Sequence, residues 1–252
     1  MKLFLFLSRY DRETKKHHTQ HVLFDTALLG ADEERASVAT ALAYINAHPE
    51  ITDENGDTVA PVAWDCNCLQ KRCGACAMVI DGSPRLACDA RLSEFAKKGP
   101  VTIEPLKKFP VIEDLIVDRT VLFSHLRQLR LWTGNRKDPE ENMNANGIGD
   151  EEKRAAVYEG SRCMQCGLCL EVCPNFHAEG DFFGTASAVP ASRILALQNA
   201  KPDTDSRALR KDYRARVFEG CGKSLACRNI CPAGIDIDGV LARNAHTAVW
   251  RG

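Results

Sequence analysis

Eleven of the twelve cysteines in this 252-residue chain fall into three regularly spaced groups. These groups are Cys68-x4-Cys73-x2-Cys76 with Cys88, Cys163-x2-Cys166-x2-Cys169-x3-Cys173-Pro174, and Cys221-x5-Cys227-x3-Cys231-Pro232. Thiolates at such spacings are the usual ligands of iron–sulfur clusters, which carry out one-electron chemistry. This feature constrains the fold, because each site must bring its sulfurs together from several points along the chain.

Composition restricts the remaining classes of function. The 33 Lys and Arg residues nearly balance 34 Asp and Glu residues, so charge gives no case for nucleic acid as a partner. The apolar fraction of 44% can build a core, and the apolar run Leu3–Leu7 is too short for a signal peptide or a membrane helix. We therefore expect a soluble protein of a reducing cytoplasm, with metal-bound thiolates and with membrane attachment only through a partner.

The N-terminal part is predicted to be a mixed β domain. The predicted elements are strands at Lys2–Tyr10, Gln20–Phe24 and Val101–Glu104, a helix at Ala36–Ala47, and a hairpin of Ala77–Ile80 and Pro84–Cys88 that turns at Asp81-Gly82. Strands wrapped on one helix, with a cysteine loop before a hairpin, match the β-grasp arrangement of plant-type ferredoxins.

Helices are predicted to dominate the rest of the chain. The predicted helices are Glu113–Trp132, Glu151–Ser161, Ala191–Asn199 and Ile237–Val249, and the polar stretch Thr133–Gly149 is predicted to be a surface loop. The fold class is therefore α+β. We expect a [2Fe–2S] β-grasp domain at 1–108, a connecting helix and loop at 109–149, and an all-α, bacterial-ferredoxin-like domain with two cubane-type clusters at 150–252.

The first cysteine group fits a [2Fe–2S] cluster. Plant-type [2Fe–2S] ferredoxins use C-x4-C-x2-C and a distant fourth cysteine, which assigns Cys68, Cys73, Cys76 and Cys88 as ligands. Gly74 suits this loop, since a residue without Cβ lets backbone N–H groups approach the sulfurs. The alternative is a zinc site that uses Cys73-x2-Cys76 and two further ligands.

The second and third groups are two copies of the bacterial C-x2-C-x2-C-x3-C-P unit, with Ser224 at the position of one cysteine in the second copy. In two-cluster ferredoxins, the fourth cysteine of each unit serves the cluster of the other unit. This crossover assigns Cys163, Cys166, Cys169 and Cys231 to a [4Fe–4S] cluster, and Cys173, Cys221 and Cys227 to a [3Fe–4S] cluster. A fourth iron bound by Ser224 is the alternative for the second site.

Cys66 lies outside the three groups, and a buried free thiol is the simpler interpretation. The alternatives are that it tunes the neighbouring cluster or is sensitive to redox conditions. The sequence contains no phosphate-binding glycine loop, serine nucleophile elbow or acid–base carboxylate pair. We therefore predict no catalytic residue for bond chemistry on an organic substrate.

The three predicted clusters and their order along the chain closely resemble those of the iron–sulfur subunit of succinate dehydrogenase and fumarate reductase. The resemblance extends to Thr102–Leu106, Phe109–Asp118, Trp132, Leu241–Asn244 and Ala248–Trp250. It implies a flavoprotein subunit with FAD and the dicarboxylate site, a cytochrome b-type membrane anchor subunit, and a quinone near the [3Fe–4S] cluster. It also implies an electron-transfer role, peripheral to the cytoplasmic face of the bacterial plasma membrane.

Several residues depart from the family pattern. Asn67 and Leu69 flank the first ligand, where members usually have serine and arginine, and Gly222 stands where some members have histidine. Asn175-Phe176-His177 replaces the tryptophan and serine of ubiquinone-reducing members. The quinone type therefore stays open, with His177 either a quinone-side residue or an ordinary surface histidine. Alternative functions are an iron–sulfur subunit of a related flavoprotein enoate reductase, and a zinc-stabilised interaction protein.

Overall fold

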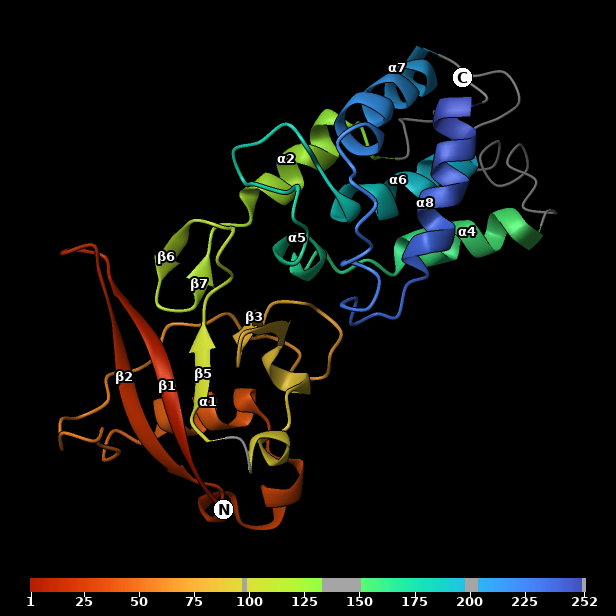
Figure 1. Ribbon diagram of the computed structural model, residues 1–252. Coiled ribbons are helices and arrows are strands. Elements are labelled where there is room, and N and C mark those ends of the chain that lie inside the picture. Colours follow the sequence, from red (N-terminus) through yellow and green to blue (C-terminus); the bar gives the residue numbers. More distant parts are fainter. Residues whose placement is uncertain (97–98, 133–150, 198–203, 251–252) are drawn as a thin grey trace. The chain divides into compact units, whose positions relative to one another are not determined.

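The computed structural model describes residues 1–96, 99–132, 151–197 and 204–250. The chain divides into two compact units, Met1–Asp118 and Arg119–Gly252, whose elements are labelled in Figure 1. The first unit thus includes residues 109–118, which the sequence placed in a connecting segment. The polar loop predicted at Thr133–Gly149 lies outside the described residues. Within the described ranges, no helix is both long and apolar enough to cross a membrane.

The N-terminal unit is built on a five-stranded mixed sheet with strand order β2-β1-β5-β3-β4 (Figure 1). The strands are β1 (Lys2–Asp11), β2 (Lys16–Asp25), β3 (Ala77–Ile80), β4 (Ser83–Leu86) and β5 (Val101–Glu104). Strand β1 is antiparallel to β2 and parallel to β5, and β3 is antiparallel to both β4 and β5. The predicted β-grasp arrangement is confirmed.

Alternating side chains decide which face of β1 is buried. Leu3, Leu5 and Leu7 are buried, while the residues between them are exposed or half-buried, as expected for a strand with one face on the core. Helix α1 (Val38–Ala47) is capped at its N-terminus by Ser37, whose side chain accepts a hydrogen bond from the Thr40 N–H. The short helices η1 (Thr26–Arg35), η2 (Ala87–Asp89) and η3 (Leu92–Phe95) complete this unit's helices among the described residues.

The β3–β4 hairpin turns where the sequence predicted. Asp81 and Gly82 both have positive φ, 50° and 72°, as the mirror-image turns of two-residue hairpins require. Ile80 pairs with Ser83, and Pro84 lies in β4, an edge strand that tolerates a residue without an N–H. The hairpin therefore carries the chain from Cys76 back to Cys88, which lies just past β4 in η2.

The helix predicted at Glu113–Trp132 is wrong in its first part. Residues before 118 form a small hairpin of β6 (Val111–Glu113) and β7 (Ile116–Val117), and helix α2 covers only Thr120–Gln128. Asp114 turns the chain with φ 43°, and the Leu115 N–H donates to the Ala63 carbonyl at 3.0 Å. Hydrogen bonds to residues outside the segment thus replace the helical hydrogen bonds that the prediction required.

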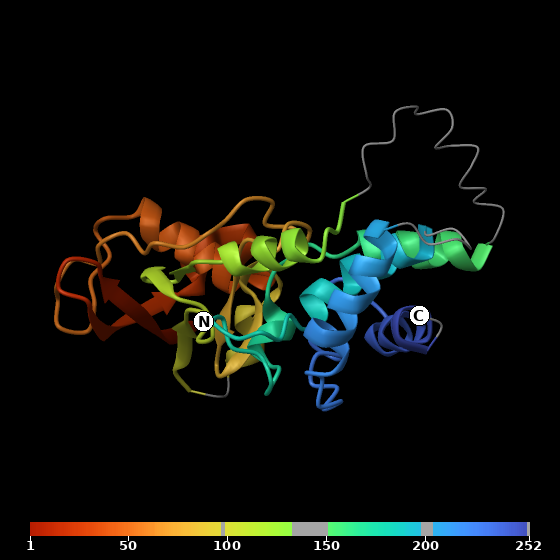
Figure 2. The same cartoon turned by 90° about the horizontal axis from the view of Figure 1, so that it is seen from above.

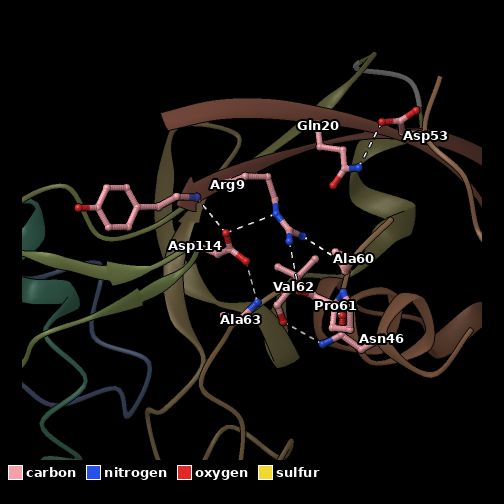
Figure 3. Close-up of polar contacts among 10 residues, drawn as sticks. Arg9, Gln20, Asn46, Asp53, Ala60, Pro61, Val62, Ala63 and Asp114 are labelled. Atoms are coloured by element: carbon pink, nitrogen blue, oxygen red, sulfur yellow. Dashed lines mark hydrogen bonds and ion pairs between the residues drawn. The ribbon is translucent and has the colours of Figure 1, made fainter. Parts of the chain in front are cut away.

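A buried ion pair between Arg9 and Asp114 explains that turn (Figure 3). The Arg9 Nε atom lies 3.4 Å from Asp114 Oδ1, and both side chains are largely shielded from solvent. The two carboxylate oxygens also accept hydrogen bonds from the backbone N–H groups of Tyr10 and Ala63, each at 2.9 Å. Asp114 therefore joins β1 to the segment that precedes the first cysteines.

The same segment is held from two further sides, as Figure 3 shows. The Arg9 guanidinium donates to the carbonyls of Ala60 and Pro61, at 3.0 and 3.2 Å. The Asn46 side chain, from α1, donates to the Val62 carbonyl at 2.9 Å and accepts from the Val62 N–H at 2.8 Å. Residues 60–63 thus have a fixed backbone although they form neither helix nor strand.

The regular elements in the described part of the C-terminal unit are all helices. Helix α6 lies beside both α4 and α8 (Figure 1 and Figure 2). Besides α2, the elements are α4 (Glu151–Ser161), α5 (Leu168–Glu171), α6 (Thr185–Leu197), α7 (Thr204–Tyr213), η4 (Arg214–Phe218), α8 (Ile237–Ala245) and η5 (His246–Trp250). The predicted helices at 151–161 and 237–249 are confirmed, whereas α7 was not predicted.

Helix α6 begins six residues before the prediction, at Thr185, and contains Pro190. Proline normally ends or kinks a helix because it lacks the N–H that bonds the carbonyl four residues earlier, here that of Ala186. Packing nevertheless keeps the helix, since Ala188, Val189 and Ala191 are buried.

Gly160 of α4 allows α4 to approach α6 closely. A Cβ atom at residue 160 would lie 2.8 Å from Ser192 Oγ and 3.0 Å from the Val189 carbonyl oxygen. Real Cβ atoms rarely come so near to backbone, so a side chain here would force the two helices apart. The close packing of this helix pair therefore depends on a glycine.

We expect Asp114→Ala to destabilise the protein strongly, because it leaves the buried Arg9 charge and two backbone N–H groups without their acceptor. Removing one partner of a buried pair costs about 3–5 kcal/mol. Thermal unfolding followed by far-UV circular dichroism would measure this as a lower midpoint.

The neighbouring Glu113→Ala is the matched control. Glu113 faces Arg12 in an exposed pair with 3.9 Å between Nη1 and Oε2, and exposed pairs contribute about 0–1 kcal/mol. Equal losses in the two variants would contradict a special role for Asp114.

Candidate functional site

The first cysteine group lies on a loop whose backbone N–H groups point at sulfur. The N–H groups of Gln70 and Arg72 donate to Cys68 Sγ, at 3.4 and 3.3 Å, and that of Lys71 donates to Cys88 Sγ at 3.3 Å. The loop reaches this arrangement with positive φ at Leu69, Lys71 and Gly74. Donors aimed at sulfur stabilise the negative charge that a ligating thiolate brings.

The electrostatics of this loop differ between its outer and inner cysteines. Hydrogen bonds from the Gln70 and Arg72 N–H groups lower the pKa of the half-buried Cys68 thiol to about 7. Burial, followed by the neighbouring Cys88 and Cys73 thiols, raises the pKa of Cys76 to about 12. All four predicted ligands interact, since Cys68 also contacts Cys73. The four predicted ligands therefore lie near one another, as the predicted [2Fe–2S] site requires.

A second donor set lines an apolar pocket in the C-terminal unit. Cys163, Cys166, Cys169 and Cys231 all face this pocket. Its other walls include the apolar side chains of Val189, Ile235 and Ile237, which also form a hydrophobic core cluster beneath it. The four cysteines come from two different sequence groups, as the crossover predicts, and Cys173, Cys221 and Cys227 are not among the lining residues.

Burial dominates the electrostatics of this pocket. It raises the pKa of Cys166 to about 11, with further contributions from the neighbouring Cys163 and Cys231 thiols. Burial likewise raises the pKa of Cys169 well above its usual value, with Cys166 the next cause. The thiols of Cys163, Cys166 and Cys169, whose pKa values burial raises, must lose their protons when a metal binds. A metal cluster, whose iron ions offset the negative charge of the thiolates, suits such a pocket.

The third donor set gathers around Cys227. Burial raises the pKa of Cys227, the Thr185 hydroxyl opposes the shift through a hydrogen bond, and the nearby Cys173 and Cys221 thiols raise it further. The three cysteines are therefore neighbours, again from two sequence groups. Ser224 is exposed between Lys223 and Leu225, which both have positive φ. Three sulfurs are the ligand set that the sequence predicts for a cluster lacking one corner iron.

Two residues outside the ligand sets depart from expectation. Cys66 is exposed, so the prediction of a buried thiol is wrong; it lies in the irregular stretch between Val62 and β3, where no element covers it. His177 is exposed, which leaves both interpretations of it open. At Gly222, a Cβ atom would lie 3.0 Å from Asn175 Oδ1, so a side chain here would require the Asn175 amide to move.

Sequence reasoning missed two side chains that contact cysteine sulfur. The Gln165 amide donates to Cys163 Sγ at 3.1 Å, and the Thr185 hydroxyl bonds to Cys227. Gln165 lies inside the Cys163-x2-Cys166 spacing, where any residue type satisfies the motif, and Thr185 lies far from both cysteines in sequence. Neither residue gave a signal that the spacing alone could reveal.

Comparisons with known proteins identify iron–sulfur domains in both parts of the chain. A family model described as a 2Fe-2S iron-sulfur cluster binding domain matches residues 5–124, and one described as a 4Fe-4S dicluster domain matches residues 159–235. The chain is similar to the succinate dehydrogenase iron-sulfur subunit of Bacillus subtilis, with 38% identity over 80% of this chain and 77% of that protein.

Further relatives point the same way. The fumarate reductase iron-sulfur subunit of Mycobacterium tuberculosis is 29% identical over 84% of this chain and 81% of that protein. A chain of the Mycobacterium smegmatis Sdh1 complex in the apo form matches with a TM-score of 0.74 and 24% identity, over 99% of this chain and 96% of that chain, and so shares the fold. The chain belongs to the family of iron–sulfur subunits of succinate dehydrogenase and fumarate reductase.

Proposed function

We propose that this chain is the electron-transfer subunit between a flavoprotein subunit, with FAD and the succinate/fumarate site, and a quinone. Iron–sulfur clusters supply one-electron redox chemistry at the three donor sets. Cys68, Cys73, Cys76 and Cys88 would hold [2Fe–2S], Cys163, Cys166, Cys169 and Cys231 would hold [4Fe–4S], and Cys173, Cys221 and Cys227 would hold [3Fe–4S].

The observation that carries this proposal is the pocket lined by cysteines of two sequence groups. Cys231 belongs to the third group, yet it faces the same pocket as Cys163, Cys166 and Cys169. Cys173, the last cysteine of the second group, interacts instead with Cys227. This exchange of fourth cysteines is typical of proteins with two adjacent cubane-type clusters, and it supports a [4Fe–4S] and a [3Fe–4S] site.

The protein's own residues provide the environment that such clusters need. Backbone amides stabilise the charge on Cys68 and Cys88 at the surface loop, and apolar side chains keep water from the buried pocket. We place the chain at the cytoplasmic face of the membrane, bound there through an anchor subunit. The relatives named succinate dehydrogenase and fumarate reductase subunits support these partners and do not favour the alternative enoate reductase.

Anaerobically purified protein should contain about nine irons per chain, since the three proposed clusters hold two, four and three. Electron paramagnetic resonance should show a signal of the [3Fe–4S] type in the oxidised protein and signals of the other two clusters after reduction. An iron content of eight or ten would instead revise the assignment around Ser224. A colourless protein with zinc would contradict the proposal altogether.

Replacing Cys173 should separate the two C-terminal clusters. We expect Cys173→Ser to abolish the oxidised [3Fe–4S] signal and to leave the [4Fe–4S] signal, because Cys173 interacts with Cys227 and does not line the other pocket. Cys66→Ser is the matched control, and it should retain all three signals, since Cys66 belongs to no donor set. Loss of the [4Fe–4S] signal alone in Cys173→Ser would show that the crossover is wrong.

The partners can be tested on the native complex. We expect the chain to copurify with an FAD-containing subunit, and the complex to catalyse succinate oxidation or fumarate reduction with quinone analogues. Because electrons must pass this chain, Cys173→Ser should reduce the quinone-linked rate more than the rate with an artificial acceptor that reacts at the flavin. A complex that acts on neither dicarboxylate would contradict the proposed function.

A further inference from the structure

Gln165 lies inside the second cysteine group and lines the same pocket as Cys163, Cys166, Cys169 and Cys231. Its backbone has a φ of 53°, a left-handed conformation that residues other than glycine seldom adopt. Its side-chain Nε2 atom donates to Cys163 Sγ at 3.1 Å. The backbone of Gln165 also gives Cys163 a hydrogen bond, so the side chain supplies a second donor to the same sulfur.

A proline in a neighbouring helix fixes the orientation of this amide. In a regular helix, the N–H of residue 190 would bond to the Ala186 carbonyl, but Pro190 has no N–H. The Gln165 Nε2 atom instead donates to the Ala186 carbonyl oxygen at 2.9 Å. One amide proton therefore replaces the missing helical hydrogen bond, which leaves the second proton for the sulfur.

The alternative orientation of the amide is unfavourable. Rotating the amide by 180° would place Oε1 against both the Ala186 carbonyl oxygen and the Cys163 sulfur, so that no donor would face either acceptor. In the observed orientation, Oε1 is buried without a hydrogen-bond partner among the described residues. An unsatisfied buried acceptor is unfavourable, so the two donated hydrogen bonds must outweigh it.

We propose that Gln165 raises the reduction potential of the [4Fe–4S] cluster through its hydrogen bond to the ligand Cys163, and that the Pro190 defect in α6 holds its amide in the donating orientation. The inference rests on the proposed ligand assignment. Reduction adds negative charge that spreads onto the ligand sulfurs, and an N–H donor aimed at sulfur stabilises that charge. Gln165 thus acts through the ligand Cys163 and favours the reduced state of the cluster.

Redox titration of the purified complex, followed by electron paramagnetic resonance, tests the proposal. Gln165→Met keeps an unbranched side chain of similar length and removes the donor. We expect the midpoint potential of its [4Fe–4S] cluster to shift to more negative values, while the [2Fe–2S] and [3Fe–4S] midpoints stay unchanged. Electron–nuclear double resonance in deuterated buffer should also lose an exchangeable proton that couples to the wild-type cluster.

Gln128→Met is the matched control. Gln128 is exposed at the end of α2 and does not line the cysteine pocket, so all three midpoints should equal the wild-type values. If Gln165→Met does not assemble, Gln165→Asn provides the second variant, since its shorter side chain keeps the amide but cannot span both acceptors.

The outcomes distinguish the inference from the proposed function. A wild-type complex without a [4Fe–4S] signal would overturn the ligand assignment itself. A wild-type complex with that signal, together with Gln165 variants whose [4Fe–4S] midpoint is unchanged, would overturn only the role of Gln165. A common shift of all three midpoints would also overturn it, because a general structural disturbance would then be the cause.

Discussion

The C-terminal unit depends on sulfurs that converge from distant stretches of chain onto one apolar pocket. Cys163, Cys166 and Cys169 approach from the segment around α5, and Cys231 approaches from the loop before α8. Apolar packing is what holds these stretches together, since each fully buried side chain such as Ile237 contributes about 1.5–3 kcal/mol. The same packing disfavours charged thiolates. The apo pocket therefore favours neutral thiols, whereas metal binding requires deprotonated thiolates.

The two units stabilise negative charge on cysteine sulfur in different ways. At the surface loop, successive backbone N–H groups surround Cys68, and positive φ values at Leu69 and Lys71 turn them inward. In the buried pocket, backbone hydrogen bonds from Gln165 and Leu168 reach Cys163 and Cys166, and the Gln165 side chain adds a further donor to Cys163. The first solution depends on loop geometry, whereas the second depends also on residue identity at position 165. Substitutions near the second site should therefore alter cluster electronics more readily than substitutions near the first.

Strand and helix patterns in the sequence, with the cysteine loop before a hairpin, allowed the β-grasp fold and the helical second unit to be predicted. Cysteine spacing predicted three separate donor sets, because metal ligation requires particular residues to meet. The Asp81-Gly82 hairpin was predictable for a local reason, namely that both residues accept positive φ. The helix start at Thr120 was not predictable, since the Arg9–Asp114 pair decides it through contacts between residues far apart in sequence. The exposure of Cys66 is a similar case, because burial depends on neighbours that no local pattern reveals.

Gly160 connects helix spacing to the evolution of the metal site. The residue binds no metal and makes no turn, yet a methyl group there would meet the Val189 carbonyl oxygen at 3.0 Å. Cys163 follows only three positions later, so its sulfur moves with the end of α4. Substitution of Gly160 during evolution is therefore limited by the geometry that the cysteine ligands require. Larger residues should be tolerated only alongside compensating changes in α6.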